Sequence, residues 1–81
     1  KRELPLPRDL IATLFRQLQE LFPQASVSQL DGLRLDWPDR WLLVRASNTE
    51  PVVRCIAESS QEGAAVTLCE QAIELAQQVA S

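Results

Sequence analysis

Residues 31–46, DGLRLDWPDRWLLVRA, decide the fold of this chain. The stretch opens on Asp31-Gly32, a dipeptide whose backbone tolerates the positive φ angles of a tight hairpin turn. Leu33 to Trp37 then alternates apolar and charged side chains, and this period of two predicts a half-buried strand. Pro38-Asp39 marks another turn, and the nearly apolar run from Trp41 to Ala46 predicts the next strand. Connections this short force antiparallel pairing.

Elements on both sides of this stretch extend the pattern. Residues 25–30 are short, compatible with a strand and rich in Ser and Val, and residues 52–58 form an apolar run after a polar interruption. Residues 9–22 place their apolar side chains on one side of a helix, and Pro23 stops that helix. The sequence therefore predicts one helix followed by four strands.

A second helix is predicted from a capping box. Ser59 and Glu62 have the three-residue spacing of that motif, which satisfies exposed N–H groups at a helix start, and a narrow apolar face continues to about Val79. The predicted order is α-β-β-β-β-α. The predicted fold is α+β, a four-stranded antiparallel sheet covered by two helices, in one domain over residues 9–81. Residues 1–8 are interpreted as a linker or lead-in.

Composition limits the classes of function. Eighty-one residues suffice for one small domain, and the sequence contains no Met, so we expect a piece of a longer protein. The net charge is −3 and the Lys and Arg residues are scattered, which argues against nucleic-acid binding. No apolar run approaches the length that a bilayer requires, so we expect no membrane association and a cytoplasmic location.

The two cysteines, Cys55 and Cys69, lie in apolar settings, and the sequence has no His to complete a zinc site. We interpret both as free, buried residues of a protein in a reducing compartment, although the sequence alone leaves a disulfide open. We expect no metal site in this chain.

One polar segment, residues 45–51 (RASNTEP), differs from ordinary packing residues. A phosphate dianion needs a forked cationic donor, several neutral donors and converging backbone N–H groups. Arg45 supplies the guanidinium, and small polar donors come from Ser47, Asn48 and Thr49. Asn also enters the left-handed region more readily than other non-glycine residues, which would turn successive N–H groups inward.

A purely structural interpretation stands beside this one. A Ser-Asn-Thr cluster before Pro51 is typical of plain turns. Arg54 lies in the middle of a predicted strand and is expected to pair with Glu50 or Glu58, shaping the loop only. Trp37 and Trp41 flank a turn, and we interpret both as cross-strand packing residues rather than a ligand platform.

Together these segments resemble the C-terminal domain of the α-D-phosphohexomutases, most closely the bacterial phosphomannomutase/phosphoglucomutase branch. The resemblance covers nearly the whole chain from Asp9, and its motifs are residues 31–35 (DGLRL), 41–44 (WLLV) and 45–51 with Arg54. The phosphoglucosamine mutase branch typically has Gly where this chain has Asn48. The resemblance implies a TATA-binding-protein-like fold.

The resemblance also implies a division of labour. In the family, a phosphoserine of the first domain exchanges its phosphoryl group with a hexose phosphate through a bisphosphorylated sugar, and magnesium is held by the second domain. The fourth domain grips the phosphate that does not react. Carried over, that role falls to Arg45, Ser47, Asn48 and Thr49 and to the backbone at Ala46.

Glu50, Pro51 and Arg54 are assigned to loop shape. The expected partners are a hexose phosphate and the other domains of the same protein. The catalytic serine and the metal loop are expected in those domains, so this fragment alone should be inactive. The competing hypotheses are a stand-alone anion-binding or protein-interaction module and the equivalent domain of a phosphoglucosamine mutase.

Overall fold

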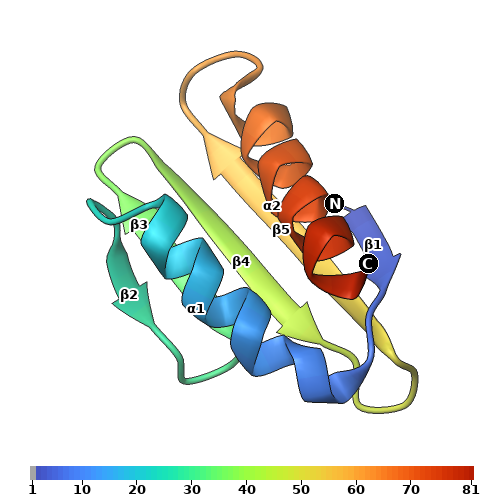
Figure 1. Cartoon of the computed structure of the whole chain (residues 1–81). Helices are drawn as coiled ribbons and strands as arrows, with labels where there is room; N and C mark the ends of the chain where they lie inside the picture. The colour runs from blue at the N-terminus through green and yellow to red at the C-terminus, as the bar shows by residue number, and fades with distance from the viewer. Residues whose placement is uncertain (1) are drawn as a thin grey trace.

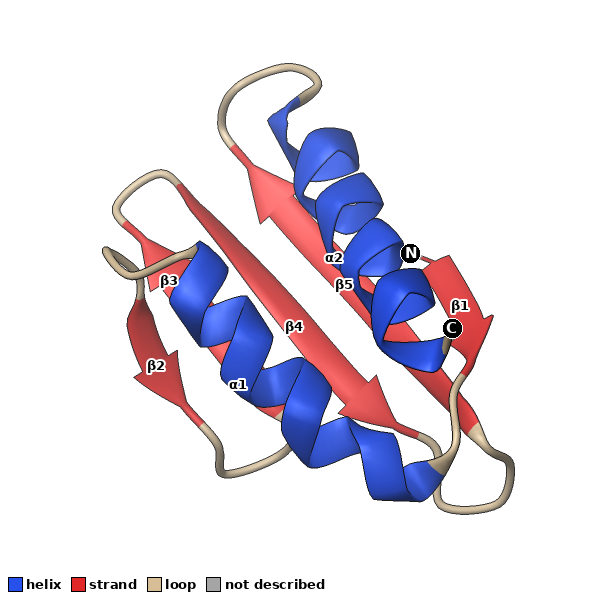
Figure 2. Ribbon diagram, viewed as in Figure 1, coloured by secondary structure: helices blue, strands red, loops and turns tan. Residues whose placement is uncertain are grey.

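Strand pairing is antiparallel throughout the computed structural model, which describes residues 2–81. Five strands form one sheet in the order β1-β5-β4-β3-β2, and both helices lie on the same face of it (Figures 1 and 2). The elements in chain order are β1 (Arg2–Pro5), η1 (Arg8–Leu10), α1 (Ile11–Leu21), β2 (Ser26–Ser28), β3 (Leu33–Trp37), β4 (Arg40–Ala46), β5 (Val52–Ser59) and α2 (Ala64–Ala80). The predicted α+β class and the antiparallel pairing are confirmed.

The sheet has one strand more than the four predicted. The additional strand, β1, pairs with β5 and places Leu4 opposite Val53. Pro5 and Pro7 hide this strand in the sequence, because proline removes a donor from the ladder and breaks the apolar period. An edge strand tolerates proline, and β1 is an edge of this sheet.

The predicted capping box is wrong. Ser59 is the last residue of β5, and its hydroxyl accepts a hydrogen bond from the backbone N–H of Gln61 at 3.0 Å within a turn. Helix α2 begins only at Ala64, after Gly63 with φ of 79°. The three-residue spacing therefore belongs to a strand-to-helix turn, in which a glycine provides the left-handed step that other residues rarely adopt.

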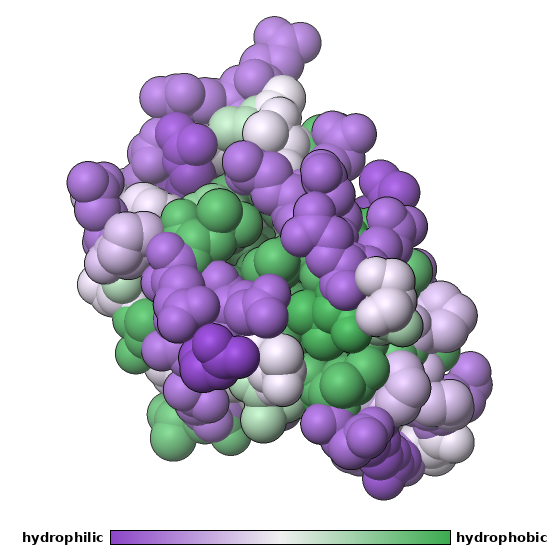
Figure 3. All heavy atoms as spheres, viewed as in Figure 1, coloured by the Kyte–Doolittle hydropathy of each residue, from purple (hydrophilic) through white to green (hydrophobic). Residues whose placement is uncertain are grey.

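The two faces of the sheet differ in character. The side chains toward the helices are apolar and form the core with them, while the register places Arg34, Leu43 and Ile56 in one row on the opposite, helix-free face. Buried core residues are Leu6, Leu14, Leu18, Leu33, Leu35, Leu42, Val44, Val53, Cys55, Leu68, Cys69, Ala72, Ile73 and Ala76. On the helix side, Figure 3 shows apolar surface in the strip between the two helices, flanked by polar side chains. On the helix-free face the strands place several charged side chains, among them Arg34, Arg45 and Arg54.

Trp37 and Trp41 do not pack against each other, because the register places them on opposite faces of the sheet. Trp37 makes an edge-to-face contact with Phe22 beyond α1, with ring centroids 5.3 Å apart. Trp41 lies 4.6 Å beneath the guanidinium of Arg34 from the neighbouring strand. Both rings therefore have packing partners, and the Trp41 contact is cross-strand as predicted.

Cys55 and Cys69 are free and buried, as predicted. The Cys69 Sγ–H group points to the backbone carbonyl of Cys55 at 3.7 Å. Burial raises the pKa of both thiols, that of Cys55 to about 12, so neither is poised to act as a thiolate. Neither helix in the described part of the chain has the length and apolar character of a membrane span.

Candidate functional site

Two arginines face each other on the helix-free side of the sheet. Arg45 is the penultimate residue of β4, and the antiparallel register places it directly opposite Arg54 of β5. Like charges directly opposite in a sheet destabilise the pair of strands. A position that keeps two guanidinium groups side by side therefore needs negative charge nearby, from the protein or from a ligand.

Within the chain, each arginine has a carboxylate partner on its outer side. Nη2 of Arg45 lies 3.2 Å from Oδ1 of Asp31, and Nε of Arg54 lies 2.5 Å from Oε2 of Glu3. Both contacts are partly exposed, and the Arg45 side chain is 48% accessible. The predicted pairing of Arg54 with Glu50 or Glu58 is wrong. The unpredicted strand β1 brings Glu3 directly opposite Arg54 instead.

Gly32 makes room for the Arg45 side chain. Its φ is +81°, as the Asp31-Gly32 turn predicts, and a Cβ there would lie 2.6 Å from the Val44 carbonyl oxygen and 2.8 Å from Cγ of Arg45. A side chain at position 32 would thus strain the backbone and displace the arginine stem. The same dipeptide that joins the strands also supports the site.

Ser47 organises the loop between β4 and β5. Its N–H donates to the Val52 carbonyl at 3.0 Å, and its hydroxyl oxygen accepts hydrogen bonds from the N–H groups of Thr49 and Glu50 at 3.3 and 3.4 Å. Ser47 is buried and its Oγ lies 3.4 Å from that of Thr49. Because its oxygen accepts, the proton of the Ser47 hydroxyl can still be donated.

The expected left-handed backbone at Asn48 is absent, because no non-glycine residue among those described has a positive φ. A different device orients the loop. The Arg8 guanidinium donates to the Asn48 carbonyl at 2.6 Å, and the Leu6 N–H donates to the Pro51 carbonyl at 2.7 Å. Figure 1 shows the segment between β1 and α1 running beside this loop. Arg8 could not be recognised as a loop residue from the sequence, because it lies 40 positions from its partner in an aperiodic segment.

These side chains border one hollow. It has a volume of about 170 Å³ and is lined by Arg45, Ala46, Ser47, Asn48, Arg54 and Ile56. Thr49 belongs to the same loop but does not line this hollow. A hollow lined by two guanidinium groups and a polar loop can bind a small anion with several acidic oxygens.

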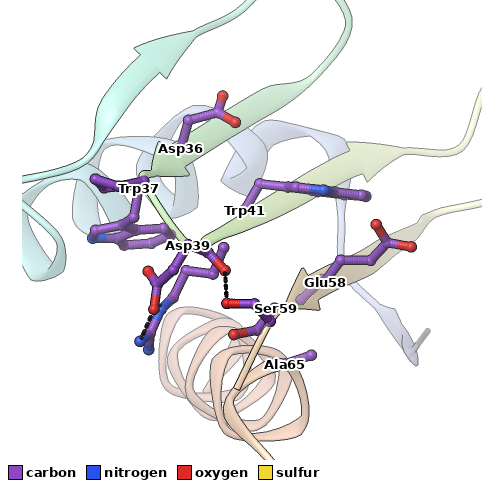
Figure 4. Close-up of a pocket in the computed structure, with 11 residues that line it drawn as sticks. Asp36, Trp37, Asp39, Trp41, Glu58, Ser59 and Ala65 are labelled. Atoms are coloured by element: carbon purple, nitrogen blue, oxygen red, sulfur yellow. Dashed lines mark hydrogen bonds and ion pairs between the residues drawn. The ribbon is translucent and has the colours of Figure 1, made fainter. Parts of the chain in front are cut away.

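A second hollow lies at the opposite end of β4 and contains Trp37, Asp39, Trp41 and Glu58 (Figure 4). The cation that lines it has a local partner: Arg40 donates to both carboxylate oxygens of Asp39, at 3.1 and 2.8 Å. These hydrogen bonds hold the pKa of Asp39 below its usual value. This hollow therefore offers no uncommitted cationic fork to an anion.

Metal-ligating side chains do not cluster in groups of three or more anywhere in residues 2–81. The polar side chains that line the hollow beside Arg45 carry guanidinium, hydroxyl and amide groups. The domain is thus an α+β fold in which two opposed arginines beside a polar loop provide a donor set suited to a small anion.

Comparison with known sequences defines the family. The C-terminal domain family of phosphoglucomutase/phosphomannomutase matches residues 8–76, and this chain belongs to that family. The resemblance seen in the sequence is thereby confirmed. The match begins at Arg8, the residue that holds the loop.

Its relatives include both named branches. A probable phosphoglucosamine mutase of Pyrococcus abyssi is 32% identical over 93% of this chain, and one of Methanocella arvoryzae is 48% identical over 57% of it. The phosphomannomutase/phosphoglucomutase of Pseudomonas aeruginosa is 42% identical over 65% of this chain. The chain spans only 10, 18 and 11% of the Methanocella, Pyrococcus and Pseudomonas relatives, respectively.

Proposed function

We propose that this chain is the substrate-phosphate-binding domain of a phosphohexomutase and that the hollow beside Arg45 holds the phosphate that does not react. The observation that carries the proposal is the opposition of Arg45 and Arg54 in the β4–β5 register. A phosphate dianion between two guanidinium groups removes the repulsion that this register otherwise creates. Membership of the family supports the same assignment.

Within this site, Arg45 binds the phosphate through two parallel N–H···O bonds, and Arg54 supplies a second guanidinium rather than serving loop shape alone. Ser47 and Asn48 donate to the remaining oxygens, and the backbone at Ala46 completes that wall. Thr49 would reach the phosphate only from the rim, because it does not line the hollow. Glu50 and Pro51 shape the exit of the loop, where the Val52 N–H donates to the Glu50 carbonyl at 2.8 Å.

A clamp of this kind suits a reaction in which a bisphosphorylated sugar must turn around. It recognises a phosphate and little of the sugar, so it accepts either end of the intermediate. Catalysis is then the task of other domains of the protein, which would carry the phosphoserine and magnesium, and this domain by itself has no mutase activity. We place the protein in the cytoplasm, where two free buried thiols stay reduced.

We favour hexose 1-phosphate and hexose 6-phosphate as substrates, with mannose and glucose phosphates preferred because Asn48 resembles that branch. Phosphoglucosamine mutase activity is the second candidate, and the identity to the Pyrococcus abyssi relative over most of the chain favours it. The clamp would be the same in both. Assays of the full-length protein with glucose 1-phosphate, mannose 1-phosphate and glucosamine 1-phosphate distinguish the two.

Titration of the chain with glucose 1-phosphate, followed by NMR, tests the clamp. Chemical shift changes confined to residues 45–54 are expected. Arg45→Ala should weaken binding by about 1.5–3 kcal/mol, the range for hydrogen bonds to charged groups. Arg40→Ala is the matched control, because it removes the same charge from the other end of the same strand. Shifts scattered over the chain, or equal losses in both variants, would overturn the proposal.

A further inference from the structure

Four charged residues form a row across the helix-free face. From one edge inward they are Glu3 of β1, Arg54 of β5 and Arg45 of β4, followed by Asp31 in the turn before β3. The cations are inside and the carboxylates outside. Each carboxylate comes from a segment remote in sequence from the arginine that it contacts.

The atoms in these contacts matter for ligand binding. A guanidinium binds an anion through two N–H groups on one edge, and Nη2 belongs to both of the edges that can do so. Asp31 lies against Nη2 of Arg45, so its carboxylate interferes with either bidentate arrangement. Glu3 contacts Nε of Arg54 and thereby occupies the lateral edge of that group.

Exposure makes these contacts easy to exchange. The Asp31 side chain is 74% accessible and that of Glu3 is 50% accessible, so water can solvate each carboxylate after release. Exposed ion pairs of this kind are weak. By contrast, Asp36 holds Arg34 through three hydrogen bonds of 2.9 to 3.2 Å on the same face.

We infer that Asp31 and Glu3 are internal competitors for the phosphate site, which occupy the two arginines until an incoming phosphate displaces them. This inference rests on the proposed function and adds a pair of residues that set the affinity of the clamp. The carboxylates offset the Arg45–Arg54 repulsion in the free domain, and they weaken binding by repelling the dianion. Glu3 also accepts a hydrogen bond from Nε of Arg54 and so holds a donor that the dianion needs. A clamp that must release either end of the sugar phosphate would benefit from such weakening.

The test compares inorganic phosphate binding by wild type, Asp31→Asn and Glu3→Gln at low ionic strength and pH 8, measured by NMR titration. Asp31→Asn should bind phosphate about three- to tenfold more tightly, an effect expected for one unit charge near a dianion. Glu3→Gln should act in the same direction. In about 1 M salt, the phosphate affinity of both variants should approach that of wild type, because salt screens charges at this separation.

Asp36→Asn is the matched control. It makes the same charge change on the same face of the sheet but leaves the site intact, so its affinity should equal that of wild type. Equal or weaker binding by Asp31→Asn overturns the inference. If Asp31→Asn fails this test but Arg45→Ala loses phosphate binding, the proposed function stands and only the inference about the carboxylates falls. If neither wild type nor any variant binds phosphate, the proposed function itself is overturned.

Discussion

The two ends of the β4–β5 strand pair each carry an arginine, and the two arginines differ in their partners. At the first end, Arg40 of β4 lies opposite Ser59 and binds both oxygens of Asp39, its neighbour in the chain. At the other end, Arg45 lies opposite Arg54 and has a single contact with a carboxylate from another segment. The first arginine is held by two hydrogen bonds to a local partner, whereas the second has one ion-pair contact and keeps more of its donors open.

Under the proposed function, this difference separates a structural charge from a binding charge in a small sheet. A pair formed between chain neighbours is complete as soon as the turn forms, so it needs no ligand. A cation placed opposite another cation depends on negative charge from elsewhere, which in the free domain comes from the exposed carboxylates of Asp31 and Glu3. Proteins retain such arrangements chiefly at functional sites. Matched substitutions at the two ends of the strand pair test this difference.

The largest expected effect is at the two glycines with positive φ. Gly32→Ala should lower the free energy of unfolding by about 2–4 kcal/mol, because it adds left-handed strain to a clash with the Val44 carbonyl and the Arg45 stem. Gly63→Ala has a similar φ of +79° but no atom within 4 Å of the added Cβ, so about 1 kcal/mol is expected. Urea denaturation of both variants measures the difference. Equal losses would mean that the Arg45 end is not tightly packed.

A smaller difference in stability is expected between Ser47, at the Arg45 end, and Ser59, at the Arg40 end. Ser47→Ala removes an acceptor for two backbone N–H groups in a buried position, which should cost about 1–2 kcal/mol of stability. Ser59→Ala, at the opposite end, removes one acceptor of an exposed N–H group and should cost about 0.5 kcal/mol or less. Thermal unfolding of the two variants gives the comparison. A larger loss for Ser59→Ala would contradict the view that Ser47 organises the loop.

How much of this could be predicted depends on how far apart the partners lie in the sequence. The period of two in residues 33–37 and the helical period in residues 9–22 are local signals. Strand β3 was therefore predicted to the residue and α1 to within two residues at each end. Strand β1 was missed because its pairing depends on Val53 and the rest of a distant β5, while its own composition gives no period.

In the candidate site, too, the local features could be predicted and the long-range contacts could not. The polar composition of residues 45–51 identified the loop, and the Asp31-Gly32 turn was predicted with its positive φ. The contacts that give the loop and arginines their geometry come from Glu3, Leu6 and Arg8, up to 51 positions away. The mistaken left-handed backbone at Asn48 has the same origin, because propensity suggested a local device where the structure uses a remote one.

The smallest expected effect concerns acid sensitivity at the Arg40 end. Hydrogen bonds from Arg40 lower the pKa of Asp39, so this carboxylate stabilises the folded state above the unfolded-state pKa of about 4, and that stability is lost as the pH falls through the folded-state value. Asp39→Asn should therefore be less stable than wild type at pH 6, and the difference should shrink steadily as the pH falls below about 4. The measurement is urea denaturation of both proteins at a series of pH values. Since the pair is partly exposed, the difference should be small and should shrink in high salt. A stability difference that persists unchanged at the lowest pH would mean that Asp39 acts through turn geometry rather than through its charge. The Asp39–Arg40 ion pair would then not be the reason that Arg40 differs from Arg45.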